Sequence, residues 1–197
     1  MKILIDNGHG VDTKGKRSPD GQLREYSWTR RCASLLEDAL TERGYDAQCI
    51  VPEDIDISLS ERCKRVNSIC KRVGAKNVIL VSIHCNAAGA DGQWHSARGW
   101  EAWTSIGTTA ADRLATCLYK AAKKAGLKIR EDMSDGDPDK EGHLYILKHS
   151  LCPAVLTENL FQDNKEDVEY LMSDKGIKEI VNIHVNGIVN YIKNKSV

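Results

Sequence analysis

Three side chains that can bind a metal or transfer a proton stand at the ends of short apolar runs. His9 comes soon after the first apolar run of the chain, His84 closes a longer run at residues 78–83, and Glu158 directly follows residues 154–157. The carboxyl ends of parallel strands lie along one edge of an open α/β sheet, and such sheets bind ligands at that edge. We therefore expect His9, His84 and Glu158 to meet there.

A second carboxylate, that of Glu25, is expected close to this edge. Glu25 begins a predicted helix and shares one stripe of it with Trp28, Cys32 and Leu36, at i+3, i+7 and i+11. Its carboxylate should therefore face inward at the amino end of the helix. A glutamate in a first turn also stabilises a helix through the helix dipole, so a capping role is the alternative.

Two imidazoles and one carboxylate are the ligand set of a catalytic zinc ion, which keeps a fourth position open. A second carboxylate nearby is the group that such a site needs to take a proton from water. The residues alone allow either glutamate to take either role. Gly8 and Gly10 flank His9, and glycine lets the backbone approach a metal closely.

Two other patterns in the sequence do not predict a functional site. Gly10 to Lys16 has the spacing of a phosphate-binding loop, but Arg17 stands where that loop needs Ser or Thr. Residues 18–21 (Ser-Pro-Asp-Gly) then have turn chemistry rather than that of a helix start. Basic residues recur on a predicted helix opposite an apolar face, and we interpret them as a solvated helix face: Arg62, Lys64, Arg65, Lys71 and Arg72.

The elements that would position these side chains alternate between strand and helix. Apolar patterns predict strands at residues 2–6, 45–51, 77–84, 100–105, 144–147 and 154–157. Helical periodicity predicts helices at residues 25–43, 58–73, 108–126, 165–172 and 175–193. The acidic segment 129–142 is predicted to be an exposed loop. This order indicates one α/β domain over residues 1–197.

Composition excludes several classes of function. The 197 residues suit one domain, and 28 basic residues balance 28 acidic ones, so no nucleic-acid partner is expected. Without a long apolar window, and with a first apolar run too short for a signal peptide, we expect neither a membrane anchor nor an N-terminal export signal. The seven cysteines lack a C-x-x-C pair, which favours buried thiols in a chain made under reducing conditions. The oligomeric state stays open.

Four segments in chain order resemble motifs of the zinc-dependent N-acetylmuramoyl-L-alanine amidases, the Amidase_3 family. They are residues 7–10 (Asn-Gly-His-Gly), residues 21–25 (Gly-x-x-x-Glu), residues 82–87 (Ser-Ile-His-Cys-Asn-Ala) and residues 153–161 (Pro-Ala-Val-Leu-Thr-Glu-Asn-Leu-Phe). The resemblance runs from the first strand to the last helices. It implies a zinc-carboxypeptidase-like (phosphorylase/hydrolase-like) α/β fold, with a mostly parallel, mixed sheet of about six strands flanked by helices. It also implies that His9, Glu25 and His84 bind one Zn²⁺ per chain and that Glu158 is catalytic.

The implied reaction is hydrolysis of the amide between the lactyl group of N-acetylmuramic acid and L-alanine in peptidoglycan. Glu158 would accept a proton from water and return it to the leaving nitrogen. Asn86 is either a hydrogen-bond donor to the substrate or a turn residue. The alternatives are a related zinc peptidase or sugar deacetylase, and a non-catalytic, zinc-containing protein that binds peptidoglycan.

Three residues, in two of the motifs, depart from the family pattern. Cys85 stands where the family commonly has Ala, and Asn159-Leu160 stand where it has Thr-Gly. Side chains alternate along a strand, so Cys85 should point away from His84 and serve packing. We expect Asn159 and Leu160 to shape the pocket floor.

The implied substrate lies outside the cytoplasm. We therefore expect a chain made in the cytoplasm that reaches the cell wall through a holin or on lysis, as an endolysin does. The other possibility is the mature form of an exported autolysin.

Overall fold

Six strands form one sheet in the order β2-β1-β3-β6-β4-β5 in the computed structural model, which describes residues 1–195. The strands are β1 (Lys2–Asn7), β2 (Asp46–Cys49), β3 (Val78–Asn86), β4 (Glu101–Thr104), β5 (Lys140–Glu141) and β6 (Ala154–Phe161). The helices are α1 (Glu25–Thr41), α2 (Leu59–Val73), α3 (Ala110–Lys124), α4 (Tyr145–His149), α5 (Lys165–Met172) and α6 (Asp174–Lys195), with a 3₁₀ turn, η1 (Ala75–Asn77), before β3.

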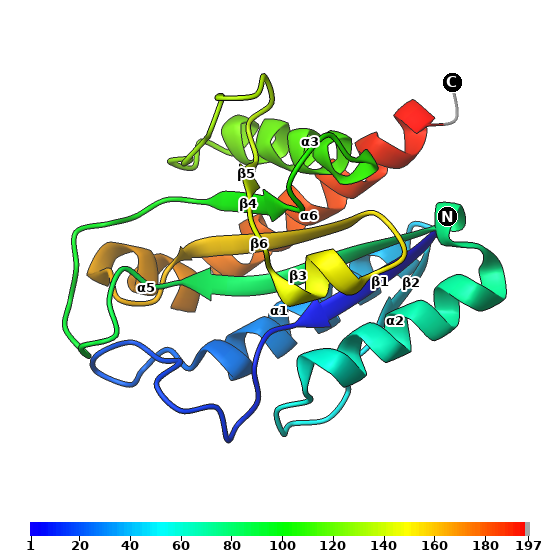
Figure 1. The fold of residues 1–197 in the computed structure, drawn as a ribbon. Helices are drawn as coiled ribbons and strands as arrows, with labels where there is room; N and C mark the ends of the chain where they lie inside the picture. The colour runs from blue at the N-terminus through cyan, green and yellow to red at the C-terminus, as the bar shows by residue number, and fades with distance from the viewer. Residues whose placement is uncertain (196–197) are drawn as a thin grey trace.

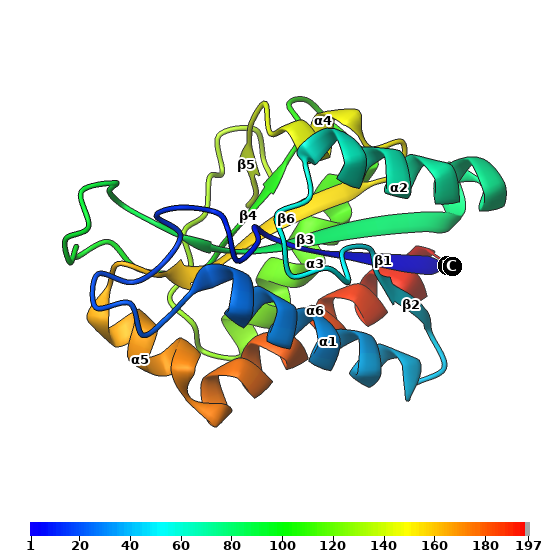
Figure 2. The ribbon, with the colours of Figure 1, turned by 90° about the horizontal axis from the view of Figure 1, so that it is seen from below.

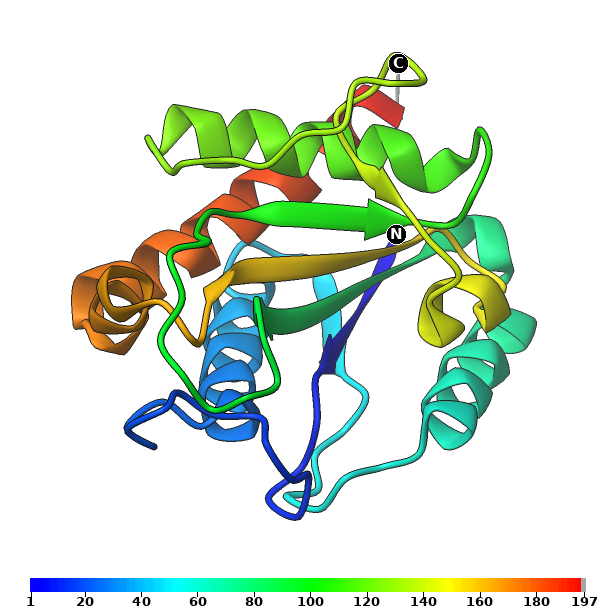
Figure 3. The same ribbon diagram turned by 60° about the vertical axis from the view of Figure 1, so that its left-hand side comes forward.

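The sheet is mostly parallel, as the sequence predicts. β1 pairs in parallel with both β2 and β3, and β3 pairs in parallel with β6. β4 runs antiparallel to β6, while β5 is parallel to β4. Figure 3 shows β4, β6, β3 and β1 side by side in this order. The carboxyl ends of β1, β3 and β6 therefore share one edge of the sheet (Figure 1).

Helices cover the sheet on both faces. α2 and α4 lie on one face, and α1, α5 and α6 lie on the other (Figure 2). α6 packs along both α1 and α3, so these three helices form the thicker layer. No helix in the described part of the chain combines the length and the apolar character that a membrane span requires.

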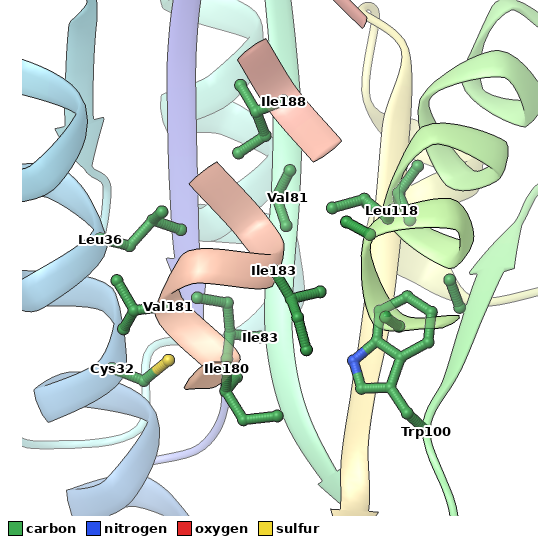
Figure 4. Close-up of a cluster of buried hydrophobic side chains, with 14 of the residues drawn as sticks. Cys32, Leu36, Val81, Ile83, Trp100, Leu118, Ile180, Val181, Ile183 and Ile188 are labelled. Atoms are coloured by element: carbon green, nitrogen blue, oxygen red, sulfur yellow. The ribbon is translucent and has the colours of Figure 1, made fainter. Parts of the chain in front are cut away.

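The main hydrophobic core lies between the sheet and the layer of α1, α3 and α6. Figure 4 shows Val81 and Ile83 of β3 facing side chains of α6, with Cys32 and Leu36 of α1 on one side and Leu118 of α3 on the other. Val81, Ile83 and Leu36 are fully buried. A smaller cluster under α2 and α4 covers the other face. Central strands buried on both faces read as continuous apolar runs, as β3 does at its start.

The predicted strand at residues 144–147 is wrong. These residues lead into the helix α4, in which Ile146 and Leu147 are both buried. Strand alternation would bury one of two neighbouring side chains, whereas a helix lying against a sheet can bury both. A short apolar run does not separate these cases by its pattern alone.

The sixth strand lies instead inside the acidic segment that the sequence predicts as a loop. β5 consists of two residues and pairs with Trp103 and Thr104 of β4. Just before it, Asp139 is only 2% exposed and accepts a 2.5 Å hydrogen bond from Thr104 Oγ1. Burial raises the pKa of Asp139 to about 8, so the neutral carboxyl is favoured in the interior, and this hydrogen bond partly replaces water. The expectation that the whole segment is exposed is therefore wrong for this end of it.

The thiols follow the prediction. All seven cysteines are free, and five of them are buried. Cys85 is 3% exposed and belongs to the main core, on the face of β3 opposite the side chain of His84. The predicted packing role of Cys85 is confirmed.

Candidate metal centre

β3 and β6 bring His84 and Glu158 together. The two residues are directly paired between the parallel strands. Immediately beyond them the register shifts, because Asn159 and Leu160 of β6 stand opposite Cys85 alone. Such a bulge next to a site re-aims the side chains around it.

Leu160 has a φ of 66°, a conformation that is strained for residues other than glycine. Its side chain is 5% exposed and packs in the main core. Asn159 is fully buried, accepts a 2.9 Å hydrogen bond from Trp100 Nε1 and donates to the His84 carbonyl at 3.0 Å. The expectation that both residues shape the pocket floor is wrong, since Leu160 fills the core and Asn159 ties β6 to β3.

His9 follows β1 in a left-handed conformation, with a φ of 62°. Its carbonyl oxygen accepts hydrogen bonds from Arg30 Nη1 at 2.9 Å and from Arg62 Nη2 at 3.3 Å. Strained conformations persist where the surroundings over-determine them, and two guanidinium groups do so here. Gly8 is required beside it, because a Cβ at that position would collide with the His84 ring.

Arg62 is not part of a solvated face, contrary to the prediction. It is 2% exposed and donates at 2.6 Å both to Asp6 Oδ1 and to the Asn7 carbonyl. Its Nη2 also bonds Asp56 Oδ1 at 3.1 Å. A buried charge needs a partner of opposite charge and acceptors for its remaining hydrogen-bond donors, and Arg62 has both. Asp6, the charged residue at which the first apolar run of the chain stops, was the one sequence feature that could have indicated this partner.

Glu25 places its carboxylate between the two histidines. It is 1% exposed, and Trp28, Cys32 and Leu36 on the same stripe of α1 are also buried. Glu25 Oε1 lies 3.2 Å from His84 Nδ1 and 3.4 Å from His9 Nε2, and it accepts a 3.0 Å hydrogen bond from the Cys85 N–H. The carboxylate thus bonds groups outside α1, so a capping role does not account for it.

His9, Glu25 and His84 each offer a ligand atom within 4.8 Å of the other two. Two ligands at about 2.0 to 2.1 Å from a tetrahedral zinc ion would lie about 3.3 Å apart. The separations of Glu25 Oε1 from the two imidazole nitrogens are 3.2 and 3.4 Å. Glu25 Oε2 is buried without a hydrogen-bond partner among residues 1–195. The donor set and its spacing therefore fit a zinc ion.

The charges of this group depend on one another. Burial alone raises the pKa of Glu25, but hydrogen bonds from His84 and His9 outweigh burial and hold that pKa well below its usual value. Burial lowers the pKa of His84, whereas the Glu25 carboxylate raises it to a net value above normal. A buried carboxylate beside two imidazoles is thus held as an anion, the form in which it can bind a metal.

Glu158 lies beside this group but outside it. Its Oε2 is buried and has no hydrogen-bond partner in the described part of the chain. Burial, reinforced by the charges of Glu25 and Glu101 and opposed by His84, raises the pKa of Glu158 to about 8. A carboxyl group whose pKa lies near the working pH can both accept and return a proton.

Asn86 has partners of its own. Its Nδ2 donates to Glu101 Oε1 at 2.9 Å, and its Oδ1 accepts from the Ala87 N–H at 2.8 Å. It therefore acts as a turn residue at the end of β3, and its contact with substrate stays a prediction. Glu101 and its ion-pair partner Arg130, with Nε and Oε2 2.8 Å apart, are the residues that sequence reasoning missed. The signal for them was a lone carboxylate at the start of the short strand β4.

A cavity of about 480 Å³ opens beside His9 and His84. Side chains from α4 and the residue before it, from the start of α2 and the segment before it, and from β6 line its apolar part: Ile57, Leu59, Leu144, Ile146 and Leu156. Concave, mostly apolar sites with a few convergent polar groups are typical of ligand binding. The metal-binding group therefore lies at the wall of a pocket that can hold part of a substrate.

The sequence profile of the family described as N-acetylmuramoyl-L-alanine amidase matches residues 3–190. The chain belongs to this family. The resemblance carried by the four sequence motifs is thereby confirmed, and the match includes His9, Glu25, His84 and Glu158.

Individual N-acetylmuramoyl-L-alanine amidases and related lysins are similar over nearly the whole chain. An endolysin of Bacillus phage SPP1 is 27% identical over 202 residues, which cover 98% of this chain and 66% of that protein. The amidase CwlM of Bacillus licheniformis is 30% identical over 190 residues, with coverages of 95% and 67%. The chain thus spans about two thirds of the length of these relatives.

The fold agrees with this membership. A crystal structure of an N-acetylmuramoyl-L-alanine amidase from Clostridium difficile 630 superposes with a TM-score of 0.81. The two chains are 26% identical, and the match covers 98% of this chain and 97% of the other. The predicted α/β fold, with its mixed six-stranded sheet between helices, is confirmed.

Proposed function

We propose that this protein is a zinc-dependent amidase that cleaves the bond between N-acetylmuramic acid and L-alanine in peptidoglycan. The observation that carries the proposal is the geometry of one site. The imidazole nitrogens of His84 and His9 lie 3.2 and 3.4 Å from Glu25 Oε1, and Glu158 Oε2 is buried beside these three side chains without a partner among residues 1–195. Membership of the amidase family supplies the substrate class. The proposed catalytic domain comprises residues 1–197.

His9, Glu25 and His84 would hold the metal, one ion per chain. When bound, zinc lowers the pKa of water and polarises a carbonyl group. Three protein ligands leave a position free for this chemistry, which a fourth side chain would block. Cys85 does not compete for that position, because its thiol packs in the core on the other face of β3.

Glu158 would move the proton. Its free Oε2 can take a proton from the attacking water and deliver it to the nitrogen of L-alanine as the amide bond breaks. Without that proton the amine is a poor leaving group. Glu101 is less suited to this role, because both of its oxygens already accept hydrogen bonds from Asn86, Trp103 and Arg130. Asn86 could donate its second amide hydrogen to the substrate.

The proposed place of action is the cell wall. An endolysin and an N-acetylmuramoyl-L-alanine amidase are among the relatives, and their names support this proposal. Release through a holin or on lysis, and export followed by processing, would both bring this chain to peptidoglycan.

Product analysis tests the proposal. Purified sacculi are incubated with the protein, and the soluble products are identified by mass spectrometry. An amidase releases peptides that begin with L-alanine and leaves the glycan strands acetylated. Cleavage inside the stem peptide would indicate a zinc peptidase, loss of acetate a sugar deacetylase, and no product a peptidoglycan-binding protein.

Metal analysis tests the zinc requirement separately. We expect one zinc ion per chain, loss of activity in a chelator and recovery with added Zn²⁺. Full activity in a preparation free of metal would contradict the metalloenzyme. Glu158→Gln, purified in the same way, is the control for contaminating amidase.

A further inference from the structure

Beyond Glu158, the same face of the sheet carries a hydrogen-bonded group that the proposed reaction does not use. We call Asn86, Glu101, Trp103 and Arg130 the Glu101 cluster. Glu101 lies directly opposite Glu158 in the antiparallel pair of β4 and β6, so the two side chains share one face. Glu101 is 3% exposed. The cluster therefore adjoins the reacting groups on the side away from β1.

The carboxylate of Glu101 holds three neighbouring side chains in place through hydrogen bonds. Its Oε1 accepts from Asn86 Nδ2 at 2.9 Å and from Trp103 Nε1 at 3.0 Å. Its Oε2 accepts from Arg130 Nε at 2.8 Å. Because both oxygens of Glu101 already accept hydrogen bonds, neither is free to take up a proton from a substrate. Glu101 is well suited to orienting the guanidinium of Arg130.

Arg130 is held from several directions. Its backbone N–H donates to the Trp100 carbonyl at 2.9 Å. Its aliphatic chain passes Gly99, where an added Cβ would lie 3.1 Å from Arg130 Cγ. Its guanidinium carbon lies 5.1 Å from the centre of the Phe161 ring. A side chain restrained in this way loses little entropy when it binds a ligand.

The two terminal nitrogens of the Arg130 guanidinium are available to bind a ligand. The Arg130 side chain is 41% exposed, and within residues 1–195 its two terminal nitrogens have no acceptor. Arginine presents its N–H groups as a planar fork that matches a carboxylate in two parallel hydrogen bonds. This is an oriented cation with open donors, paired with Glu101, which in turn stands opposite the proposed proton-transfer residue Glu158.

We propose that Arg130 binds a carboxylate of the stem peptide, namely the α-carboxylate of the second residue when that residue is a γ-linked D-glutamate. The inference rests on the proposed amidase function and names a determinant of its substrate specificity. Glu101 is the positioning residue for Arg130. A substrate in which this carboxylate is a carboxamide, D-isoglutamine, would lose the charge-assisted pair.

The order of groups across the sheet fits the order of groups along the substrate. The metal-binding residues come from β1, α1 and β3, Glu158 from β6, and Glu101 from β4. The scissile carbonyl, the leaving nitrogen and the peptide beyond it would follow the same direction. Two extended residues reach about 7 Å, and neighbouring strands lie about 5 Å apart. The second residue can therefore reach beyond β6 to the side chains of β4.

Two matched substrates test the inference. Both are N-acetylmuramoyl peptides that differ only in the second residue, D-glutamate or D-isoglutamine, and kcat/KM is measured for each with the zinc-loaded full chain. We expect the unaltered protein to prefer D-glutamate. Arg130→Gln should lower kcat/KM about 10- to 100-fold for that substrate and less than about 3-fold for D-isoglutamine, which abolishes the preference.

Lys140→Gln is the matched control, because it removes a neighbouring cation whose Nζ lies 5.8 Å from the Trp103 ring centre. It should leave the preference intact. Equal losses on both substrates in Arg130→Gln, a preference for D-isoglutamine in the unaltered protein, or an equal loss of preference in Lys140→Gln would each overturn the inference.

Arg130→Lys serves if Arg130→Gln does not fold, since it keeps the charge beside Glu101 but not the fork. It should lose about 3- to 10-fold on D-glutamate alone, and an unchanged preference would overturn the inference. Failure of the unaltered protein to release peptide from either substrate would instead count against the amidase function itself.

Discussion

Along β3, side chains at odd and at even positions enter different environments. Ile79, Val81, Ile83 and Cys85 all lie in the main core against the layer of α1, α3 and α6. On the other face, Leu80 is buried under α2 and α4, but every even position after it is polar. The face of β3 toward α1, α3 and α6, which we call the core face, thus stays apolar to the end of the strand. The face toward α2 and α4, which we call the site face, is apolar at Leu80 and polar at every position after it.

The difference shows how one strand supports both stability and a reactive site. Because side chains alternate with a period of two, Ile83 and Cys85 anchor the backbone on either side of His84. Ser82, the first polar residue on the site face, donates a 2.5 Å hydrogen bond to Asp6 and so ties β3 to β1. The side chains of Ile83 and Cys85 can therefore hold His84 in place from the opposite face of the strand.

The largest predicted effect belongs to the site face. Glu158→Gln keeps the shape of the side chain but removes its ability to accept a proton, so activity on purified sacculi should fall about 10²- to 10⁴-fold. Zinc content and the melting temperature should stay close to those of the unaltered protein. Glu25→Gln replaces an anionic ligand and should lose zinc. A zinc-free Glu158→Gln beside a zinc-loaded Glu25→Gln would reverse the two roles.

The core face should respond in stability instead. Ile83 is fully buried, so Ile83→Ala should lower the free energy of unfolding by about 2 to 5 kcal/mol. Asn86→Ala, on the other face of the same strand, removes the hydrogen bond to Glu101 and the one from the Ala87 N–H, and should cost about 1 to 3 kcal/mol. Urea unfolding monitored by circular dichroism measures both. A larger loss in Asn86→Ala would mean that the division between the faces is wrong.

Acid should weaken the core side through His184. This residue is fully buried in α6, with Nδ1 2.8 Å from the Ile180 carbonyl and Nε2 2.9 Å from Thr157 Oγ1. Burial lowers its pKa from 6.5 to about 4, although the bond to Ile180 raises it. Above pH 6.5 the ring is neutral in both the folded and the unfolded chain, so it does not change the stability with pH. Between pH 6.5 and 4 only the unfolded chain takes up the proton, so stability falls by about 3 kcal/mol.

His184→Gln should flatten this part of the pH dependence of unfolding. The exposed His143 offers the control His143→Gln, which should keep the acid dependence of the unaltered protein. An unchanged slope in His184→Gln would assign the acid sensitivity to other groups.

The smallest predicted effect concerns the bulge where the two faces meet. Leu160 is held at a φ of 66°, so Leu160→Gly should destabilise the protein less than Leu160→Ala, by about 1 kcal/mol. At an ordinary strand position glycine is the worse of the two replacements. Thermal unfolding of the pair decides, and the ordinary order would show that the backbone at Leu160 is unstrained.

Periodicity was enough to predict most elements and the inward stripe that carries Glu25. It failed at residues 144–147, where a short apolar run suited both a strand and the observed helix α4. It also failed for Arg62, because a helical pattern separates apolar from polar faces but does not tell which cation meets a buried carboxylate. Arg62 is buried only because the end of β1 places Asp6 and the Asn7 carbonyl beside it.

The chain order of the motifs already indicated which side chains take part in the site, since the position of each at the end of a strand or the start of a helix is a local property. Only the folded chain decided how close they come, which of their atoms are left without partners, and which neighbours they share. The Glu101 cluster joins residues from β3, β4 and the segment before β5. Contacts between segments far apart in sequence follow from strand order and register, and no local pattern encodes these.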